Sequence, residues 1–165
     1  CCVLAIDTKK EEDGEWYVYL NGGRTKTDIK CFDWAKQGVD LGAGEILLTS
    51  MNNDGTKQGF ALDITKKLSV ELPIPVIASG GAGTMQHFAD VFELAYADAG
   101  LAASIFHFKE IEIADLKAFL KEKNIAVRVW APSRPSPVGK ATKAQHLLSL
   151  VFNKVQSFQN VMNIE

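Results

Sequence analysis

Two short apolar stretches of this chain end in small residues, and the backbone that follows them could bind an anion. In the stretch 75–83 the apolar run leads into Ser79, Gly80 and Gly81, and in the stretch 101–108 residues 101–103 lead into Ser104. Such runs indicate buried parallel strands whose backbone is then uncovered. Backbone N–H groups at that point favour phosphate, although tight packing of a strand against a helix also favours small residues. The predicted phosphate-binding residues are Gly80, Gly81, Ala103 and Ser104.

Two aspartates lie where a carboxylate could act on a substrate. Asp7 ends the apolar run at 2–7. At a strand end it can take and give a proton if partial burial tunes its pKa; the alternative is that it caps the next loop. Asp54 and Gly55 lie in the polar loop 51–59, where the residues alone indicate an ordinary turn.

The elements that must position these residues alternate between strand and helix. We expect strands at 2–7, 45–50, 75–80 and 99–104, helices at 28–41, 62–70, 84–96 and 112–123, and a hairpin at 16–23. Asp28 and Thr84 are the expected N-caps, and Gly42 is the expected helix stop. Four β-α repeats predict an α/β fold with a parallel sheet, which is half of a (β/α)8 TIM barrel of roughly 250 residues.

Composition limits the possible partners. The 165 residues are 47% hydrophobic and carry a net charge of −2, which gives no footprint for nucleic acid or an anionic membrane. No apolar run is long enough to span a bilayer. Cys1, Cys2 and Cys31 have neither disulfide nor metal-ligand spacing, so we expect a reducing, cytoplasmic setting and no metal.

The two ends of the chain differ from the β-α pattern. It opens inside an apolar strand without an initiator Met, and we expect this start to be a cut. We expect residues 1–128 to form the half-barrel. Residues 129–165 fall outside that pattern, with a Pro-rich linker at 131–137 and an amphipathic helix at 146–162.

Residues 2–128 resemble the C-terminal half of the cyclase subunit of imidazole glycerol phosphate synthase, an enzyme of histidine biosynthesis. The resemblance rests on VLAID, GGR at 22–24, LGAGEILLTSMNNDGTKQGF, PVIASGGAG and LAASIFHFKEI. It implies a barrel that receives ammonia from a glutaminase partner and uses no cofactor. The substrate is then a bis-phosphorylated ribotide, which is cyclised to imidazole glycerol phosphate with release of a carboxamide ribotide.

The resemblance also implies roles for individual residues. Asp7 matches one of two catalytic aspartates, and the loop of Asp54 and Gly55 contributes to a phosphate pocket. Glu45 matches a ring of charges that gates the ammonia entrance. Three hydroxyls at strand ends are expected to hydrogen-bond the ribose chain: Thr49, Ser50 and Ser79. Ala61 and Tyr96 depart from the family pattern, since an acidic residue and a glycine are usual there.

Three alternatives follow. The chain is a cyclase fragment that needs an N-terminal half-barrel or a second copy of itself, and it is inactive alone. The second alternative is the sister isomerase of the same pathway, which shares the half-barrel and the phosphate site. The non-enzymatic alternative is a phosphate-binding half-barrel that associates through its open edges.

Overall fold

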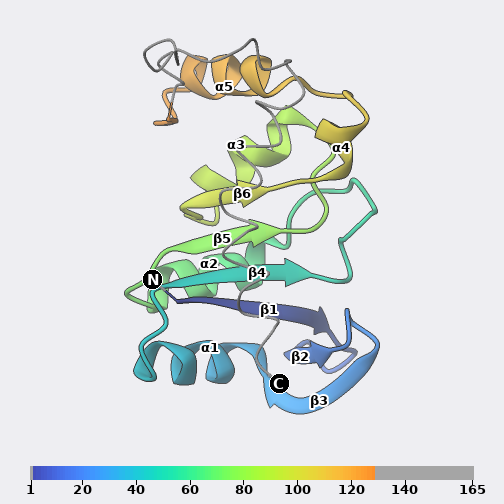
Figure 1. Ribbon diagram of the computed structural model, residues 1–165, viewed down its shortest axis with the longest axis vertical. Coiled ribbons are helices and arrows are strands. Elements are labelled where there is room, and N and C mark those ends of the chain that lie inside the picture. The colour runs from blue at the N-terminus through green and yellow to red at the C-terminus, as the bar shows by residue number, and fades with distance from the viewer. Residues whose placement is uncertain (1, 129–165) are drawn as a thin grey trace, which may run out of the picture. The chain divides into compact units, whose positions relative to one another are not determined.

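A computed structural model of the protein describes residues 2–128, which belong to one compact unit, Cys1–Arg128. Its six strands form one sheet in the order β3-β2-β1-β4-β5-β6 (Figure 1). The strands are β1 (Val3–Lys10), β2 (Trp16–Leu20), β3 (Thr25–Lys30), β4 (Glu45–Ser50), β5 (Val76–Ser79) and β6 (Ala99–Leu101). The helices are α1 (Cys31–Asp40), α2 (Leu62–Glu71), α3 (Met85–Glu93), α4 (Ser104–His107) and α5 (Ile113–Glu122).

The sheet combines parallel β-α units with one antiparallel hairpin. β1, β4, β5 and β6 are parallel neighbours, and their arrows point the same way in Figure 1. β2 pairs antiparallel with β1 and with β3, which confirms the expected hairpin after the first strand. The carboxyl ends of the four parallel strands therefore meet at one edge of the sheet.

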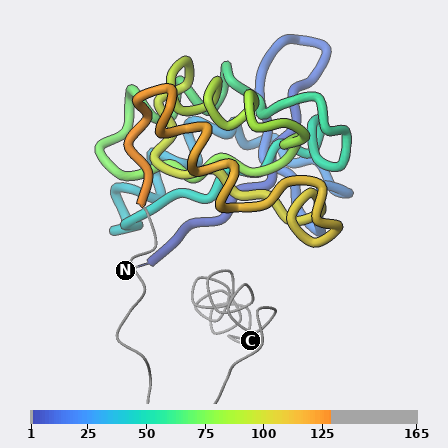
Figure 2. Tube along the Cα trace, turned by 90° about the horizontal axis from the view of Figure 1, so that it is seen from above, coloured from blue at the N-terminus to red at the C-terminus, as the bar shows by residue number. Residues whose placement is uncertain are grey.

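Alternating residues of the strands face the helices. Ile6 in β1 and Leu48 in β4 are buried in one apolar cluster with Ala35 of α1 and Leu68 of α2. A second cluster joins β5 to α3, α4 and α5, and α5 lies beside α3 (Figure 2). The side chains between the buried ones point to the opposite face of the sheet.

The hairpin is fastened to α2 by a polar contact at its base. The Trp16 indole nitrogen donates to a carboxylate oxygen of Asp63 at 3.1 Å. The Lys10 ammonium donates to the same oxygen at 2.7 Å, and its nitrogen lies 5.9 Å from the centroid of the Trp16 ring. These contacts fix the end of β1, the strand that carries Asp7.

Four expected boundaries are wrong. β1 continues to Lys10, so Asp7 lies three residues before the end of its strand, and α3 ends at Glu93 and not at Tyr96. Residues 25–30 pair with β2, so α1 begins at Cys31 and Asp28 lies in a strand instead of capping a helix. The last strand ends at Leu101, and Ser104 is the first residue of α4. In contrast, Thr84 is confirmed as an N-cap, because its hydroxyl accepts the His87 N–H at 3.3 Å.

Three further elements agree with their expected bounds. The strand at 45–50, the helix near 62–70 and the helix near 112–123 are present within one residue of the expected ends. Gly42 follows α1 with φ of +96°, as expected of a helix stop. The expected linker at 131–137 and helix at 146–162 lie outside the described residues.

Tyr96 lies in the left-handed region with φ of +56°, at the turn after α3. The residue is 56% exposed, and the Lys66 ammonium lies 5.4 Å from the centroid of its ring. A side chain with a Cβ is strained in this conformation.

We expect Tyr96→Gly to be more stable than Tyr96→Ala by about 1 kcal/mol. Both variants remove the ring and its contact with Lys66, so their difference isolates the backbone conformation. Urea unfolding of the two proteins measures it. If alanine is the more stable, as at an ordinary helical position, the left-handed turn is absent.

Candidate functional site

The strand register brings three polar side chains to one level of the sheet. Asp7 pairs with Thr49 across β1 and β4, and Thr49 pairs with Ser79 across β4 and β5. Residues paired in this way point to the same face. All three are partly exposed on the face opposite the helices. Thr49 and Ser79 lie at the carboxyl ends of their strands, whereas β1 continues for three residues beyond Asp7.

The hairpin extends this row beyond Asp7. Tyr19 of β2 pairs with Asp7, and the Lys9 ammonium lies 4.7 Å from the centroid of the Tyr19 ring. The sequence did not identify Tyr19 as a neighbour of the predicted site. The alternation of WYVYL indicates a strand, but it does not give the strand's register.

Burial and a second carboxylate change the protonation of Asp7. Removal of water around the half-buried side chain raises the pKa of Asp7 above its ordinary value, and the negative charge of Asp54 raises it further. The Asp54 carboxylate therefore lies within electrostatic reach of Asp7. A carboxyl group whose pKa is raised is suited to donate and accept a proton.

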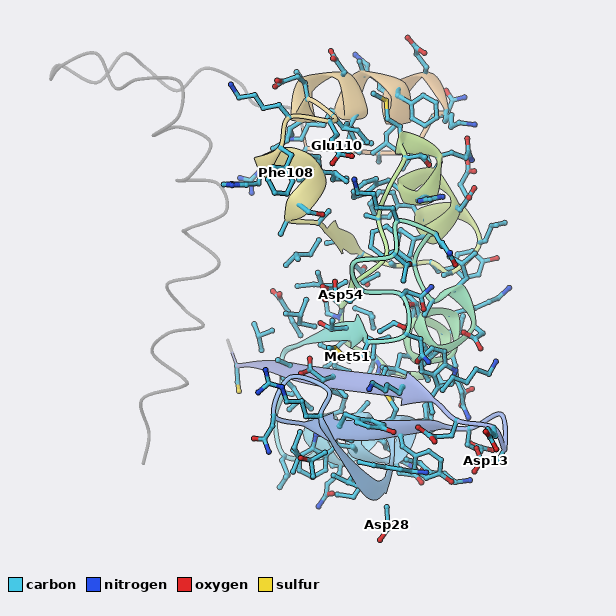
Figure 3. All side chains as sticks on the ribbon, turned by 90° about the vertical axis from the view of Figure 1, so that its right-hand side faces the viewer. Asp13, Asp28, Met51, Asp54, Phe108 and Glu110 are labelled. Atoms are coloured by element: carbon cyan, nitrogen blue, oxygen red, sulfur yellow. The ribbon has the colours of Figure 1, made fainter. Side chains whose placement is uncertain are left out.

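Asp54 belongs to a loop that closes on the end of β5. Figure 3 shows Met51 and Asp54 following β4, with Phe108 and Glu110 in the segment after α4. Gly59, at the far end of the loop, donates its N–H to the carbonyl of Gly81 at 2.7 Å. The two loops at the carboxyl ends of β4 and β5 are thus in direct backbone contact.

The glycines after β5 are required by this contact. Gly80 and Gly81 have φ of +90° and +98°. A Cβ on Gly80 would lie 2.6 Å from the Ser50 carbonyl oxygen, and one on Gly81 would lie 2.1 Å from the Gly59 carbonyl oxygen. Close loop packing therefore accounts for both glycines, which are buried between the two loops.

The remaining predicted residues lie in three different settings. Ala103 and Ser104 are exposed where β6 passes into α4. Ser50 is 1% exposed, faces the helix side with Thr8, and donates its hydroxyl hydrogen bond to Asn53 at 2.7 Å. The structure therefore separates the Ser50 side chain from Thr49 and Ser79. Glu45 begins β4, at the amino end of the sheet, away from Asp7.

Further polar contacts in this region are absent from the sequence-based prediction. The Lys57 ammonium donates to both carboxylate oxygens of Glu110, at 2.6 and 2.7 Å. This ion pair links the loop after β4 with the segment after α4. Since the two residues are 53 positions apart, spacing gives no signal of the pairing.

The described residues set limits on metal and membrane contacts. Across residues 2–128 we find no cluster of three or more His, Cys, Asp or Glu side chains arranged to hold a metal ion. In the same part of the chain, none of the helices has the length and apolar character that crossing a bilayer requires.

The repeated β/α units, with polar side chains at the carboxyl ends of parallel strands, define an α/β fold of the (β/α)8 TIM-barrel class, here with four parallel strands. A family model described as histidine biosynthesis protein matches residues 1–112, and the chain belongs to this family. This confirms the resemblance to the cyclase subunit of imidazole glycerol phosphate synthase.

Relatives in three bacteria carry the name imidazole glycerol phosphate synthase subunit HisF. The proteins of Hydrogenobaculum sp. and Flavobacterium psychrophilum are 57% and 59% identical to this chain over 129 residues, which are 78% of this chain and 51% of each relative. The protein of Halalkalibacterium halodurans is 56% identical with the same coverage. The chain therefore spans about half the length of these curated relatives.

We expect Asp7→Asn to stabilise the protein at pH 7 and to leave it unchanged near pH 3. The folded state holds the Asp7 pKa above its unfolded value, so the folded protein binds more protons between the two values. The stabilisation that results from protonating Asp7 is fully present below the pKa of Asp7 in the unfolded state. It is lost as the pH rises through the pKa of Asp7 in the folded state. Asparagine stays neutral and avoids that loss.

Urea unfolding of parent and variant at several pH values measures the effect. Asp28→Asn is the matched control, because Asp28 is exposed on β3, and it should show no comparable gain. A variant that is no more stable than its parent at pH 7 would contradict the raised pKa.

Proposed function

We propose that residues 1–128 form the C-terminal half of a cyclase of imidazole glycerol phosphate synthase. The observation that carries the proposal is the row of Asp7, Thr49 and Ser79 on one face of neighbouring strands, with Thr49 and Ser79 at the carboxyl ends of β4 and β5. Active sites of this fold lie at that end of the barrel. The names of the relatives support the reaction: ring closure of a bis-phosphorylated ribotide with ammonia to give imidazole glycerol phosphate and an aminoimidazole carboxamide ribotide.

Asp7 is the proposed catalytic residue. Its raised pKa lets the carboxyl group move a proton while the imidazole ring closes. Asp54 is proposed to assist by keeping that pKa high, from the loop that follows β4. Thr49 and Ser79 are proposed to hydrogen-bond the ribose chain of the substrate from the same face of the sheet.

One phosphate of the substrate is proposed to bind where the loops after β4, β5 and β6 meet. The proposed ligands are the backbone N–H groups of Gly55, Gly80, Gly81 and Ala103, with the hydroxyl of Ser104. The close contact of Gly59 with Gly81 supports this proposal, because it holds two of the loops together at the carboxyl ends of β4 and β5.

The proposed partners occupy the open side and the amino end of the half-barrel. Leu101 is 40% exposed on the face of the sheet away from the helices, and an N-terminal half-barrel or a second copy of this chain would cover that face. A glutaminase subunit would supply ammonia at the amino end, where Glu45 begins β4. We propose a cytoplasmic setting, and residues 129–165 as a segment outside the family pattern.

Reconstitution tests the proposed activity. We expect the chain, combined with the N-terminal half of the Hydrogenobaculum relative, to cyclise the ribotide with ammonium as nitrogen source. Asp7→Asn should lower turnover about 10²–10⁴-fold, since the amide keeps the shape but transfers no proton. Asp28→Asn serves as the control that retains activity.

The assay also separates the alternatives. A folded complex that isomerises the precursor ribotide without cyclising it would identify the sister isomerase. A complex that binds phosphate and performs neither reaction would favour the non-catalytic half-barrel. Turnover of Asp7→Asn within a few-fold of the parent would make Asp7 a structural residue.

A further inference from the structure

Asn53 uses both ends of its side-chain amide to join the two ends of the loop after β4. Its Oδ1 accepts the hydrogen bond from the Ser50 hydroxyl at 2.7 Å, at the last residue of the strand. Its Nδ2 donates to the Gly59 carbonyl at 2.9 Å, six residues further along. An amide is suited to this bridge because it supplies one acceptor and one donor group.

The backbone of Asn53 closes the turn that carries Asp54 and Gly55. Its carbonyl accepts hydrogen bonds from the Thr56 N–H at 3.0 Å and from the Thr56 hydroxyl at 2.6 Å. Asp54 and Gly55 lie between these two residues in the chain. The position of Asn53 therefore sets the position of the turn.

Asn53 also packs against the loop after β5. A Cβ built on Gly81 would lie 2.8 Å from the Asn53 Cβ. Gly59, which accepts from the Asn53 amide, donates its own N–H to the Gly81 carbonyl at 2.7 Å. One side chain thus ties the end of β4, the far end of its loop and the start of the next loop into a single unit.

We propose that Asn53 is a positioning residue that locks the loop at 51–59 onto the ends of β4 and β5 and so holds the Asp54–Gly55 turn over the substrate. The inference rests on the proposed function, which it extends to a residue outside the predicted site. Asn53 does not itself touch the reacting atoms. It acts by fixing the groups that do.

The test compares Asn53→Asp with Asn52→Ala in the full 165-residue chain. Aspartate has the shape of asparagine, but its carboxylate has no donor for the Gly59 carbonyl. Asn52 is the matched control, because it ties the same loop to a different strand: its Oδ1 accepts the Lys10 N–H at 2.8 Å. Thermal unfolding shows whether each variant folds. If Asn53→Asp does not fold, Ser50→Ala replaces it, because that change removes the other half of the bridge.

Two readouts are recorded by NMR. Hydrogen exchange of the Gly59 amide reports the lock directly, and we expect it to be at least about tenfold faster in Asn53→Asp than in the parent or in Asn52→Ala. A titration with inorganic phosphate reports the site. We expect the parent to bind on the order of 1 mM, with shifts at Gly55, Gly81 and Ser104, and Asn53→Asp to bind at least about fivefold more weakly.

Each result decides one part of the account. Unchanged exchange of Gly59 in Asn53→Asp overturns the proposal, whatever happens to phosphate. Faster exchange with unchanged phosphate affinity overturns the role of Asn53 in the site. If the parent shows no phosphate shifts, the proposed phosphate site fails, and the exchange of Gly59 still shows whether Asn53 holds the loop.

Discussion

The register between neighbouring parallel strands is the constraint on which this structure depends. β1, β4 and β5 pair without an offset that would turn their side chains to different faces, so Asp7, Thr49 and Ser79 share one level and one face. A slip of one residue in β4 would exchange Thr49 with Ser50 and place the buried hydroxyl on the open side. Because the other face is filled by Ile6, Leu48 and the helices, the apolar core enforces the register.

Loop packing then completes what the register begins. The turn with Asp54 is closed on Asn53, and the loop is fastened to Gly81 through Gly59. The proximity of Asp54 helps to raise the pKa of Asp7, so the loop affects the chemistry of a side chain on another strand. The environment of Asp7 has opposite effects on the proposed function and on stability. It suits the carboxyl group to proton transfer, but an ionised and partly buried Asp7 reduces the stability of the fold at neutral pH.

The sequence predicts the elements whose signals are local. The apolar run before Ser79 and the hydroxyl of Thr84 before α3 depend on adjacent residues, and both are present in the structure. The helical spacing that starts at Ile29 predicts Asp28 as an N-cap, whereas pairing with β2 places Asp28 in a strand. The bridge of Asn53 and the ion pair of Lys57 with Glu110 depend on the path of the backbone, which spacing does not reveal.

Register and loop packing bring the carboxyl groups of Asp7 and Asp54 within electrostatic reach of each other. A carbon-detected NMR titration of the Asp7 carboxyl group, in the parent and in Asp54→Asn, measures this coupling. We predict a pKa above the ordinary value of 3.8 in the parent and a lower pKa in the variant, because one of its two causes is removed. An ordinary pKa in the parent, or a raised pKa that does not change in Asp54→Asn, would contradict the account.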